Sequence, residues 1–115
     1  MIPTEARLLR IYVDAQDRWQ GRPLYEAIVA RARAADLAGA SVFPAEMSYG
    51  SHRQIHDAAS DYAFDGLPVV IEVVDAPDLV DALVSDLGAM LAGAVTTVQS
   101  VRVVRYSHID PEATP

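Results

Sequence analysis

A run of β-branched residues near the middle of the chain places the strongest constraint on its fold. Residues 67–75 read LPVVIEVVD, with Val69, Ile71 and Val73 on one face of an extended strand. Valines flank Glu72 on the other face, so both faces are largely apolar. This pattern is typical of a central strand. Any fold for this chain must therefore place residues 67–75 inside a sheet.

Three further strands are predicted from the sequence. Residues 6–14 and 97–106 alternate apolar and polar side chains, as half-buried strands do. Residues 40–49 form a third candidate strand that contains Pro44. Because proline cannot donate a hydrogen bond to a sheet, this strand is predicted to lie at an edge.

Two helices are predicted between these strands. Apolar residues recur at helical spacing over residues 24–36, with Pro23 at the first turn, and again over residues 77–92, with Gly93 as the C-cap. The resulting order, β-α-β-β-α-β, predicts an α+β fold, the ferredoxin-like sandwich. In it a four-stranded antiparallel sheet, in the order four-one-three-two, carries two helices on one face.

Length and charge pattern predict one domain in the cytoplasm. The chain has 115 residues, enough for one core, and we assign a single domain to residues 1–115. Its core spans about residues 6–107, a loop joins strands two and three over residues 48–66, and a frayed tail is expected over residues 108–115. Neither a signal peptide nor a bilayer-spanning run is recognisable, so no membrane insertion is expected.

Charge and composition exclude several functions. The formal net charge is −7, which repels phosphate backbones and makes nucleic acid an unlikely partner. Every basic residue except histidine is an arginine, so neither a P-loop lysine nor Schiff-base chemistry is available. Cysteine is absent, which excludes disulfides and thiolate chemistry.

One face of the predicted sheet suggests a homo-oligomer. Opposite the helices the alternation places a mixture of apolar, aromatic and charged side chains: Leu8, Arg10, Tyr12, Val70, Glu72, Val74, Arg102, Val104 and Tyr106. This face is too apolar for open water and is typical of a subunit interface that contains ion pairs. The alternative is that these residues pair only within the sheet and the charges are solvated.

The loop over residues 48–66 carries the residues most suited to chemistry. His52 and His56, followed by Asp57, would place two imidazoles together on one helical turn, which is a weak metal-binding pattern. A metal-binding or small enzyme module is therefore one hypothesis, and hydrogen-bonding loop histidines are the alternative. No recognised nucleophile or phosphate-binding motif occurs, so the chain is not expected to be an enzyme.

Arginines in the loop and the last strand favour an anionic ligand. Arg53, Arg102 and Arg105 carry guanidinium groups that match phosphate and carboxylate geometry. Structural pairing of Arg102 and Arg105 with Glu72 or other carboxylates across the sheet is the alternative interpretation. Trp19, in the first loop, is interpreted as a packing anchor at a subunit boundary rather than a platform for a ligand.

Four segments together resemble one protein family. They read RIYVDAQDRWQGRPLYEAIVARARAADLAGASVF at residues 10–43, YGSHRQIHDAAS at 49–60, LPVVIEVVDAPDLVDAL at 67–83 and VRVVRY at 101–106. In this order they resemble an uncharacterised bacterial family grouped with the PII-like signalling proteins. The resemblance extends over about residues 7–106, which is nearly the whole chain.

This resemblance implies a homotrimer whose sheets face a threefold axis. It also implies a small effector, such as an adenine nucleotide, bound between subunits, and a target protein engaged through the loop at residues 48–66. Under this hypothesis the ligand-binding residues are Tyr49, Gly50, His52, Arg53, His56, Arg102 and Arg105. Where PII proteins of nitrogen regulation carry a glycine-rich loop with a lysine, residues 88–94 read GAMLAGA. A third hypothesis is an interaction subunit without a ligand.

Overall fold

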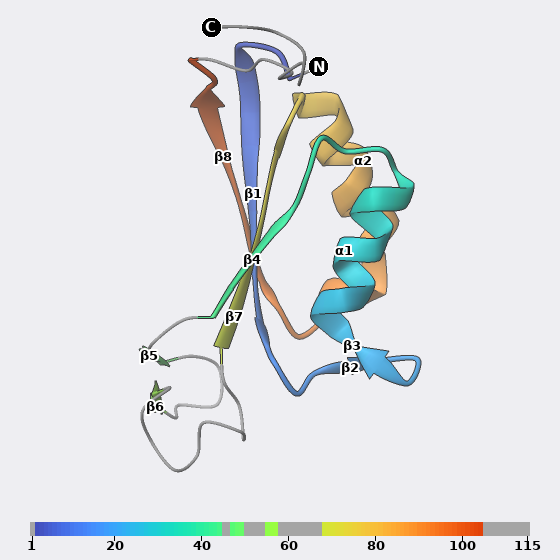
Figure 1. Cartoon of the computed structure of the whole chain (residues 1–115), viewed down its shortest axis with the longest axis vertical. Coiled ribbons are helices and arrows are strands. Elements are labelled where there is room, and N and C mark those ends of the chain that lie inside the picture. The colour runs from blue at the N-terminus through green and yellow to red at the C-terminus, as the bar shows by residue number, and fades with distance from the viewer. Residues whose placement is uncertain (1, 45–46, 50–54, 58–67, 105–115) are drawn as a thin grey trace, which may run out of the picture.

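Four antiparallel strands form the main sheet, in the order β4-β7-β1-β8 (Figure 1). They are β1 (Glu5–Asp14), β4 (Ser41–Pro44), β7 (Pro68–Asp75) and β8 (Val95–Arg102). The computed structural model describes residues 2–44, 47–49, 55–57 and 68–104. Its strand order is the predicted ferredoxin-like order, with the β-branched β7 in the interior and the Pro44 strand at an edge.

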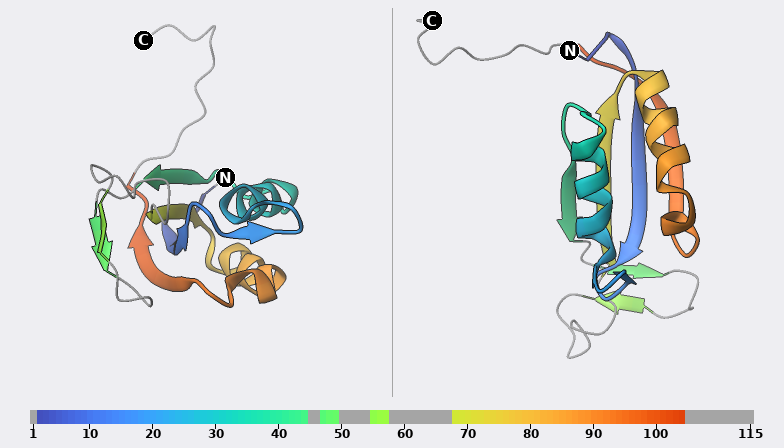
Figure 2. Two further views of the ribbon diagram at one scale, coloured as in Figure 1. Left: turned by 90° about the horizontal axis from the view of Figure 1, so that it is seen from below. Right: turned by 90° about the vertical axis from the view of Figure 1, so that its right-hand side faces the viewer.

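Two helices cover one face of this sheet, as Figure 2 shows. They are α1 (Leu24–Ala34) and α2 (Pro77–Leu87), and a 3₁₀ helix, η1 (Gly88–Leu91), follows α2 directly. The prediction that α2 continues to residue 92 with Gly93 as C-cap is wrong. Gly88 has a φ of 47° and ends the α-helix, because this left-handed conformation cannot continue it. Neither α1 nor α2, the α-helices of the described residues, is long and apolar enough to cross a membrane.

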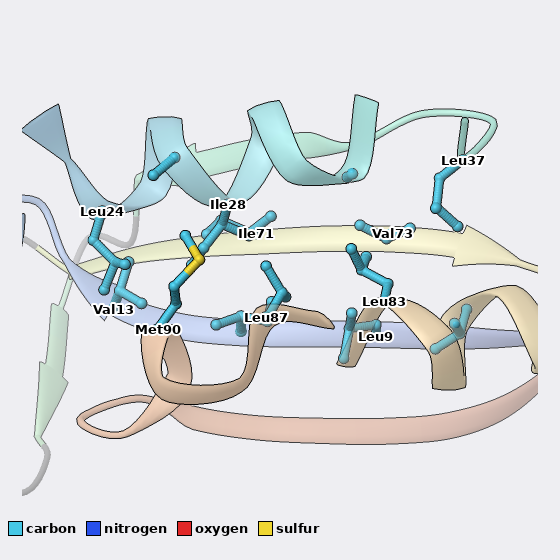
Figure 3. Packing of buried hydrophobic residues seen from close by; sticks show 14 of the residues in the cluster. Leu9, Val13, Leu24, Ile28, Leu37, Ile71, Val73, Leu83, Leu87 and Met90 are labelled. Atoms are coloured by element: carbon cyan, nitrogen blue, oxygen red, sulfur yellow. The ribbon is translucent and has the colours of Figure 1, made fainter. Parts of the chain in front are cut away.

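The hydrophobic core lies between the sheet and the helices (Figure 3). Alternation in β1 and β7 sends one set of side chains to the helices, and these are almost completely buried: Leu9, Ile11, Val13, Val69, Ile71 and Val73. The helices meet them with Leu24, Ile28, Val80, Leu83 and Leu87. At about 25 cal/mol per Å² of buried apolar surface, this cluster is the main source of stability.

Polar contacts fix how the layers meet. Asp75, at the end of β7, is 3% exposed, and its two carboxylate oxygens accept hydrogen bonds from the backbone N–H groups of Ala38 and Ala76, each at 2.8 Å. Asp75 thus joins the segment before β4 to the start of α2. Arg31 on α1 also pairs with Asp86 on α2 at 3.3 Å. These contacts hold the edge strand and the two helices in register with the sheet.

A short hairpin between β1 and α1 was not predicted. It consists of β2 (Arg18–Trp19) and β3 (Arg22–Pro23), joined by Gln20 and Gly21, whose φ angles are 48° and 83°. Two consecutive positive φ values are typical of the tight turn that suits a two-residue hairpin. The segment expected to be a polar turn is therefore an ordered projection at the end of β1.

The long connection between β4 and β7 also differs from the prediction. Residues 40–49 were expected to form one strand and residues 50–66 a loop. Instead the main sheet keeps only β4, which ends at Pro44, and two three-residue strands, β5 (Met47–Tyr49) and β6 (Ile55–Asp57), pair with each other. Proline ends the ladder to β7 because it has no N–H to donate.

Candidate functional site

The sheet face away from the helices, which we term the open face, is the largest candidate surface. Because directly opposed residues in neighbouring strands lie on the same face, the strand register defines it. Its members are Ala6, Leu8, Arg10, Tyr12, Ser41, Phe43, Val70, Glu72, Val74, Val95, Thr97, Gln99 and Val101. No helix of the described residues covers this face (Figure 2).

The contribution of β8 to the open face is shifted by one residue from the prediction. Arg102 and Val104 were expected there, but β8 pairs Val95 with Tyr12 and Val101 with Ala6. Arg102 is instead opposite Glu5, which shares the helix-facing side of β1 with Leu9. A change of one position moves a side chain to the other face of a sheet. Val101, rather than Arg102, therefore lies on the open face.

One ion pair lies in the middle of the open face. The Arg10 Nε donates to the Glu72 Oε2 at 2.7 Å, across directly opposed positions of β1 and β7. This hydrogen bond raises the pKa of Arg10, so its guanidinium stays charged at every physiological pH. The alternative interpretation of Arg102, pairing with Glu72 or another carboxylate across the sheet, does not hold for Glu72, because Glu72 pairs with Arg10 and Arg102 lies opposite Glu5. The central charges of the face neutralise each other within one subunit.

Large apolar side chains lie in the rows beside this ion pair, whereas its own row continues with Ser41 on β4 and Thr97 on β8. One neighbouring row, which we term the apolar row, consists of Phe43, Val70, Tyr12 and Val95. Phe43 is 47% exposed, Tyr12 43% and Val95 59%. Leu8, Val70 and Val74 are half-buried. A face with exposed apolar side chains and a self-neutralised charge pair suits burial against protein, since no uncompensated charge has to leave water.

Three connections meet at one end of the sheet, which we term the loop end. They are the β2–β3 hairpin, the β4–β7 connection that contains β5 and β6, and the turn from η1 into β8 (Figure 1). Seen from below in Figure 2, β2 and β3 lie on the helix side and β5 and β6 on the open-face side. Because the strands are antiparallel, connections from three distant parts of the sequence lie at the same end of the sheet.

The sequence-predicted ligand residues do not all lie at this end. Tyr49 and His56 do, in β5 and β6, where the register places Tyr49 opposite Ile55 and His56 opposite Ser48. Arg102 is exposed at the far end of β8. Seven residue steps separate it from the start of β8, or about 23 Å at 3.3 Å per residue. The structure does not bring Arg102 to Tyr49 and His56 within one subunit.

Four of the seven predicted ligand residues lie outside the described residues: Gly50, His52, Arg53 and Arg105. The metal hypothesis, which needs His52 and His56 together, therefore stays a prediction.

Two arginines at the loop end were missed by the sequence reasoning. Arg18 and Arg22 are exposed on the β2–β3 hairpin, and Arg18 Nη2 donates to the Gly21 carbonyl oxygen at 2.8 Å. Neither forms an ion pair with a carboxylate in the part of the chain that the structure describes. The usable signal was the Gln20–Gly21 pair, since glycine in a two-residue turn indicates a hairpin. Trp19, from the same hairpin, packs against the core of its own subunit, and its predicted place at a subunit boundary stays a prediction.

A family model matches residues 6–103, which span every strand of the main sheet and both helices. It describes the family DUF190, "Uncharacterized ACR, COG1993". The chain belongs to the DUF190 family. A UPF0166 protein from Aquifex aeolicus (strain VF5) is 29% identical to this DUF190 chain over 98 residues, which are 85% of the chain and 92% of the relative.

Solved structures show that this DUF190 chain has a PII-like fold. CPII, a nitrogen regulatory PII-like protein from Thiomonas intermedia K12, bound to ADP, AMP and bicarbonate, matches with a TM-score of 0.67 and 16% identity. The match covers 88% of this chain and 90% of CPII. A proposed PII-like signalling protein from Thermus thermophilus matches with a TM-score of 0.65 and 15% identity, over 90% and 94% of the two chains. The predicted PII-like fold is confirmed, and so is the predicted membership of an uncharacterised family.

Proposed function

We infer that this chain is a PII-like regulatory protein without enzymatic activity of its own. It assembles as a homotrimer and binds a small anionic effector between subunits, and an adenine nucleotide is the first candidate. The segment at residues 48–66 transmits the bound state to a target protein. The observation that carries the proposal is the uncovered apolar open face on a PII-like fold.

The chemistry of the open face supports assembly with further copies of the same chain. Its central ion pair, Arg10 with Glu72, is already satisfied, so a partner need not supply an opposite charge. Apolar side chains fill the row next to the pair, from Phe43 to Val95, and burial of apolar surface is favourable by about 25 cal/mol per Å². The charge of −7 on each chain opposes association, so the apolar burial at the contact has to outweigh this repulsion.

The likeness to CPII supports the choice of effector. The CPII structure holds ADP, AMP and bicarbonate, all of which are anions. The loop end of the present chain contains several guanidinium groups in its sequence, from Arg18 and Arg22 on the hairpin to Arg53 in the β4–β7 connection. Guanidinium groups bind phosphate and carboxylate in bidentate fashion. Arg53, Tyr49 and His56 are therefore the first residues to test.

The experiment combines light scattering with calorimetric titration. The untagged protein is titrated with ADP, AMP and bicarbonate, singly and in pairs, and with Zn²⁺. We expect a trimer mass and saturable binding of at least one nucleotide. We also expect Arg53→Ala to weaken nucleotide binding more than tenfold, since the loss of a charge-assisted hydrogen bond has about this effect. Arg33→Ala is the control, because Arg33 is exposed in the last turn of α1, away from the loop end.

Each part of the proposal has its own refutation. A monomer mass at every concentration would remove the assembly. A trimer that binds neither nucleotide nor bicarbonate would favour the interaction subunit without a ligand. Stoichiometric Zn²⁺ binding that is lost in His52→Ala would favour the metal-binding module instead.

A further inference from the structure

The β2–β3 hairpin is a projection that the rest of the fold holds in place. Trp19 packs against the core, and the N–H group of Leu24, the first residue of α1, donates to the Asp17 carbonyl oxygen at 2.7 Å. Before β2, two hydrogen bonds of 3.0 Å join Asp14 and Asp17, because the N–H group of each donates to an oxygen of the other. Both ends of the hairpin are therefore fixed, one to β1 and one to α1.

The tip of the hairpin has a defined shape as well. Gln20 and Gly21 both have positive φ angles, of 48° and 83°, and the Cβ atom of Gln20 disfavours this conformation. The Arg18 Nη2 donates to the Gly21 carbonyl oxygen at 2.8 Å, so the guanidinium group is bonded to the turn. A tip that is held in one conformation loses little conformational entropy when a partner binds it.

Two guanidinium groups at this tip contrast with the acidic chain as a whole. Arg18 and Arg22 are exposed, and neither forms an ion pair with another described residue. In the sheet and the helices, by contrast, Arg7, Arg10 and Arg31 each pair with a carboxylate. The hairpin therefore presents positive charge on a chain whose net charge is −7. Exposed arginine on an ordered element is typical of protein interfaces, in which arginine is enriched.

The register separates these two guanidinium groups. Arg18 is opposite Pro23 and Trp19 is opposite Arg22, and successive residues of a strand point to opposite faces. The side chains of Arg18 and Arg22 therefore start from opposite faces of the two-stranded ribbon. A small anion contacts one face of a ribbon at a time, whereas a larger partner with carboxylates on two sides of the tip pairs with both arginines.

The hairpin also lies away from the surface proposed for assembly. It is on the helix side of the loop end, whereas β5 and β6 are on the open-face side (Figure 2). Contacts made through the open face therefore do not involve the hairpin. Because the hairpin and the β4–β7 connection lie at the same end of the sheet, one target protein can contact both.

We propose that the β2–β3 hairpin docks between carboxylate side chains of the target protein, with Arg18 pairing on one face of the hairpin and Arg22 on the other. This inference deepens the proposed function, in which Arg53 binds the effector, because it gives the target an acidic docking site and adds a contact outside residues 48–66. Nucleic acid and anionic lipid are also negative, but their extended charge repels a chain of net charge −7. A protein cleft places a few carboxylates at the tip without such an extended charge.

The fluorescence of Trp19 reports this contact, because Trp19 is the only tryptophan of the chain and lies in the hairpin. The untagged protein is titrated with hexaglutamate at low ionic strength, and hexaglutamine is the uncharged reference. We expect a saturable change of the Trp19 emission with hexaglutamate only, which weakens as salt is added. Arg18→Gln and Arg22→Gln should each raise the Kd about threefold and the double variant about tenfold, because exposed ion pairs on opposite faces contribute independently.

The controls separate the loss of charge from a loss of structure. Arg33→Gln removes the same charge from an exposed position in the last turn of α1 and should leave the Kd unchanged. Arg18→Lys/Arg22→Lys keeps both charges and should retain most of the affinity. An unchanged emission maximum of each unliganded variant shows that Trp19 is still packed against the core. Arg22→Gln decides the outcome if Arg18→Gln disturbs this packing, because Arg18 is the residue bonded to the turn.

The outcomes separate the docking surface from the proposed function. A natural chain that does not bind hexaglutamate, or equal affinities of the natural chain and Arg18→Gln/Arg22→Gln, would overturn the docking surface. Inorganic pyrophosphate that displaces hexaglutamate at a lower concentration would show a small-anion site and overturn it too. Loss of ADP binding in the double variant would place the hairpin in the effector site, with the same consequence. A natural chain that is monomeric and binds no nucleotide overturns the proposed function, whereas the effect of the hairpin variants on hexaglutamate still decides the docking surface.

Discussion

The Asp75 carboxylate should be among the most sensitive polar positions in the chain. Its two oxygens accept the backbone N–H groups of Ala38 and Ala76. Asp75→Ala removes both bonds at once. A hydrogen bond to a charged group contributes about 1.5–3 kcal/mol, but Ala38 is exposed, so water replaces part of what its N–H group loses. We therefore expect the free energy of unfolding to fall by about 3 kcal/mol.

Urea denaturation followed by circular dichroism measures this loss. All variants are compared at one subunit concentration, because assembly makes stability depend on concentration. With a slope of about 1.5 kcal/mol per molar urea, the midpoint for Asp75→Ala should fall by about 2 M. Asp75→Asn keeps one acceptor oxygen and loses the charge, so its midpoint should lie between those of Asp75→Ala and the natural chain.

A second aspartate three residues along provides the control. Asp78 lies exposed in the first turn of α2, where its charge is favourable to the helix dipole, and it forms no ion pair with another described residue. Asp78→Ala should cost about 0.5 kcal/mol. If Asp75→Ala and Asp78→Ala shift the midpoint equally, the two hydrogen bonds of Asp75 do not stabilise the fold and the reasoning is refuted.

Two further substitutions test the open face and the hairpin. Tyr12→Glu adds a charge to the apolar row and should shift the mass in light scattering from trimer to monomer, whereas Leu79→Glu, a substitution on the exposed side of α2, should leave the trimer intact. Gly21→Ala should lower the free energy of unfolding by about 1 kcal/mol, because a φ of 83° strains any residue with a Cβ atom. Gly39→Ala, where no such φ occurs and the added Cβ meets no atom within 4 Å, should change stability by about 0.5 kcal/mol or less in a thermal or urea melt. A dimer or trimer of Tyr12→Glu, or equal effects of the two glycine substitutions, would contradict these expectations.

The sequence was sufficient for the fold because its periodicities are long. Residues 6–14 alternate over nine positions, and the α2 stripe continues for three turns, so type and order of the elements were well determined. Pro44 also predicted correctly that its strand lies at an edge of the sheet, because proline has no N–H group to donate to a neighbouring strand. A short apolar run can fit either a helix or a strand, but a pattern of this length fits only one of them.

The short strands were not predicted because their sequences are too short to show a period. The strands β2, β3, β5 and β6 have two or three residues each, which is too short for any alternation to be recognised. The C-cap of α2 was predicted at Gly93, but the helix ends at Gly88, which is also a glycine and lies five positions earlier. Only the backbone conformation, with its positive φ, distinguishes the two.

The face assignment of β8 shows where sequence reasoning loses precision. Valines at positions 98, 101, 103 and 104 fit alternation in either phase, so the pattern alone does not decide which side Arg102 faces. The pairing with β1 decides it, through contacts between residues about 90 positions apart. The phase of β8 changes the candidate site, because the observed pairing removes the charge of Arg102 from the open face.

That shift strengthens the case for assembly. With Arg102 on the open face, the face would have carried two guanidinium groups beside one carboxylate, and burying it would have left an unpaired charge at a cost of several kcal/mol. With Val101 there instead, Arg10 and Glu72 are the only charged residues among the open-face members, and they neutralise each other. The same one-residue change places Val95 in one row with Tyr12, Val70 and Phe43, so that an apolar row crosses all four strands of the sheet. The proposed homotrimer would bury this row without leaving an uncompensated charge, and this is the physical argument for assembly through the open face.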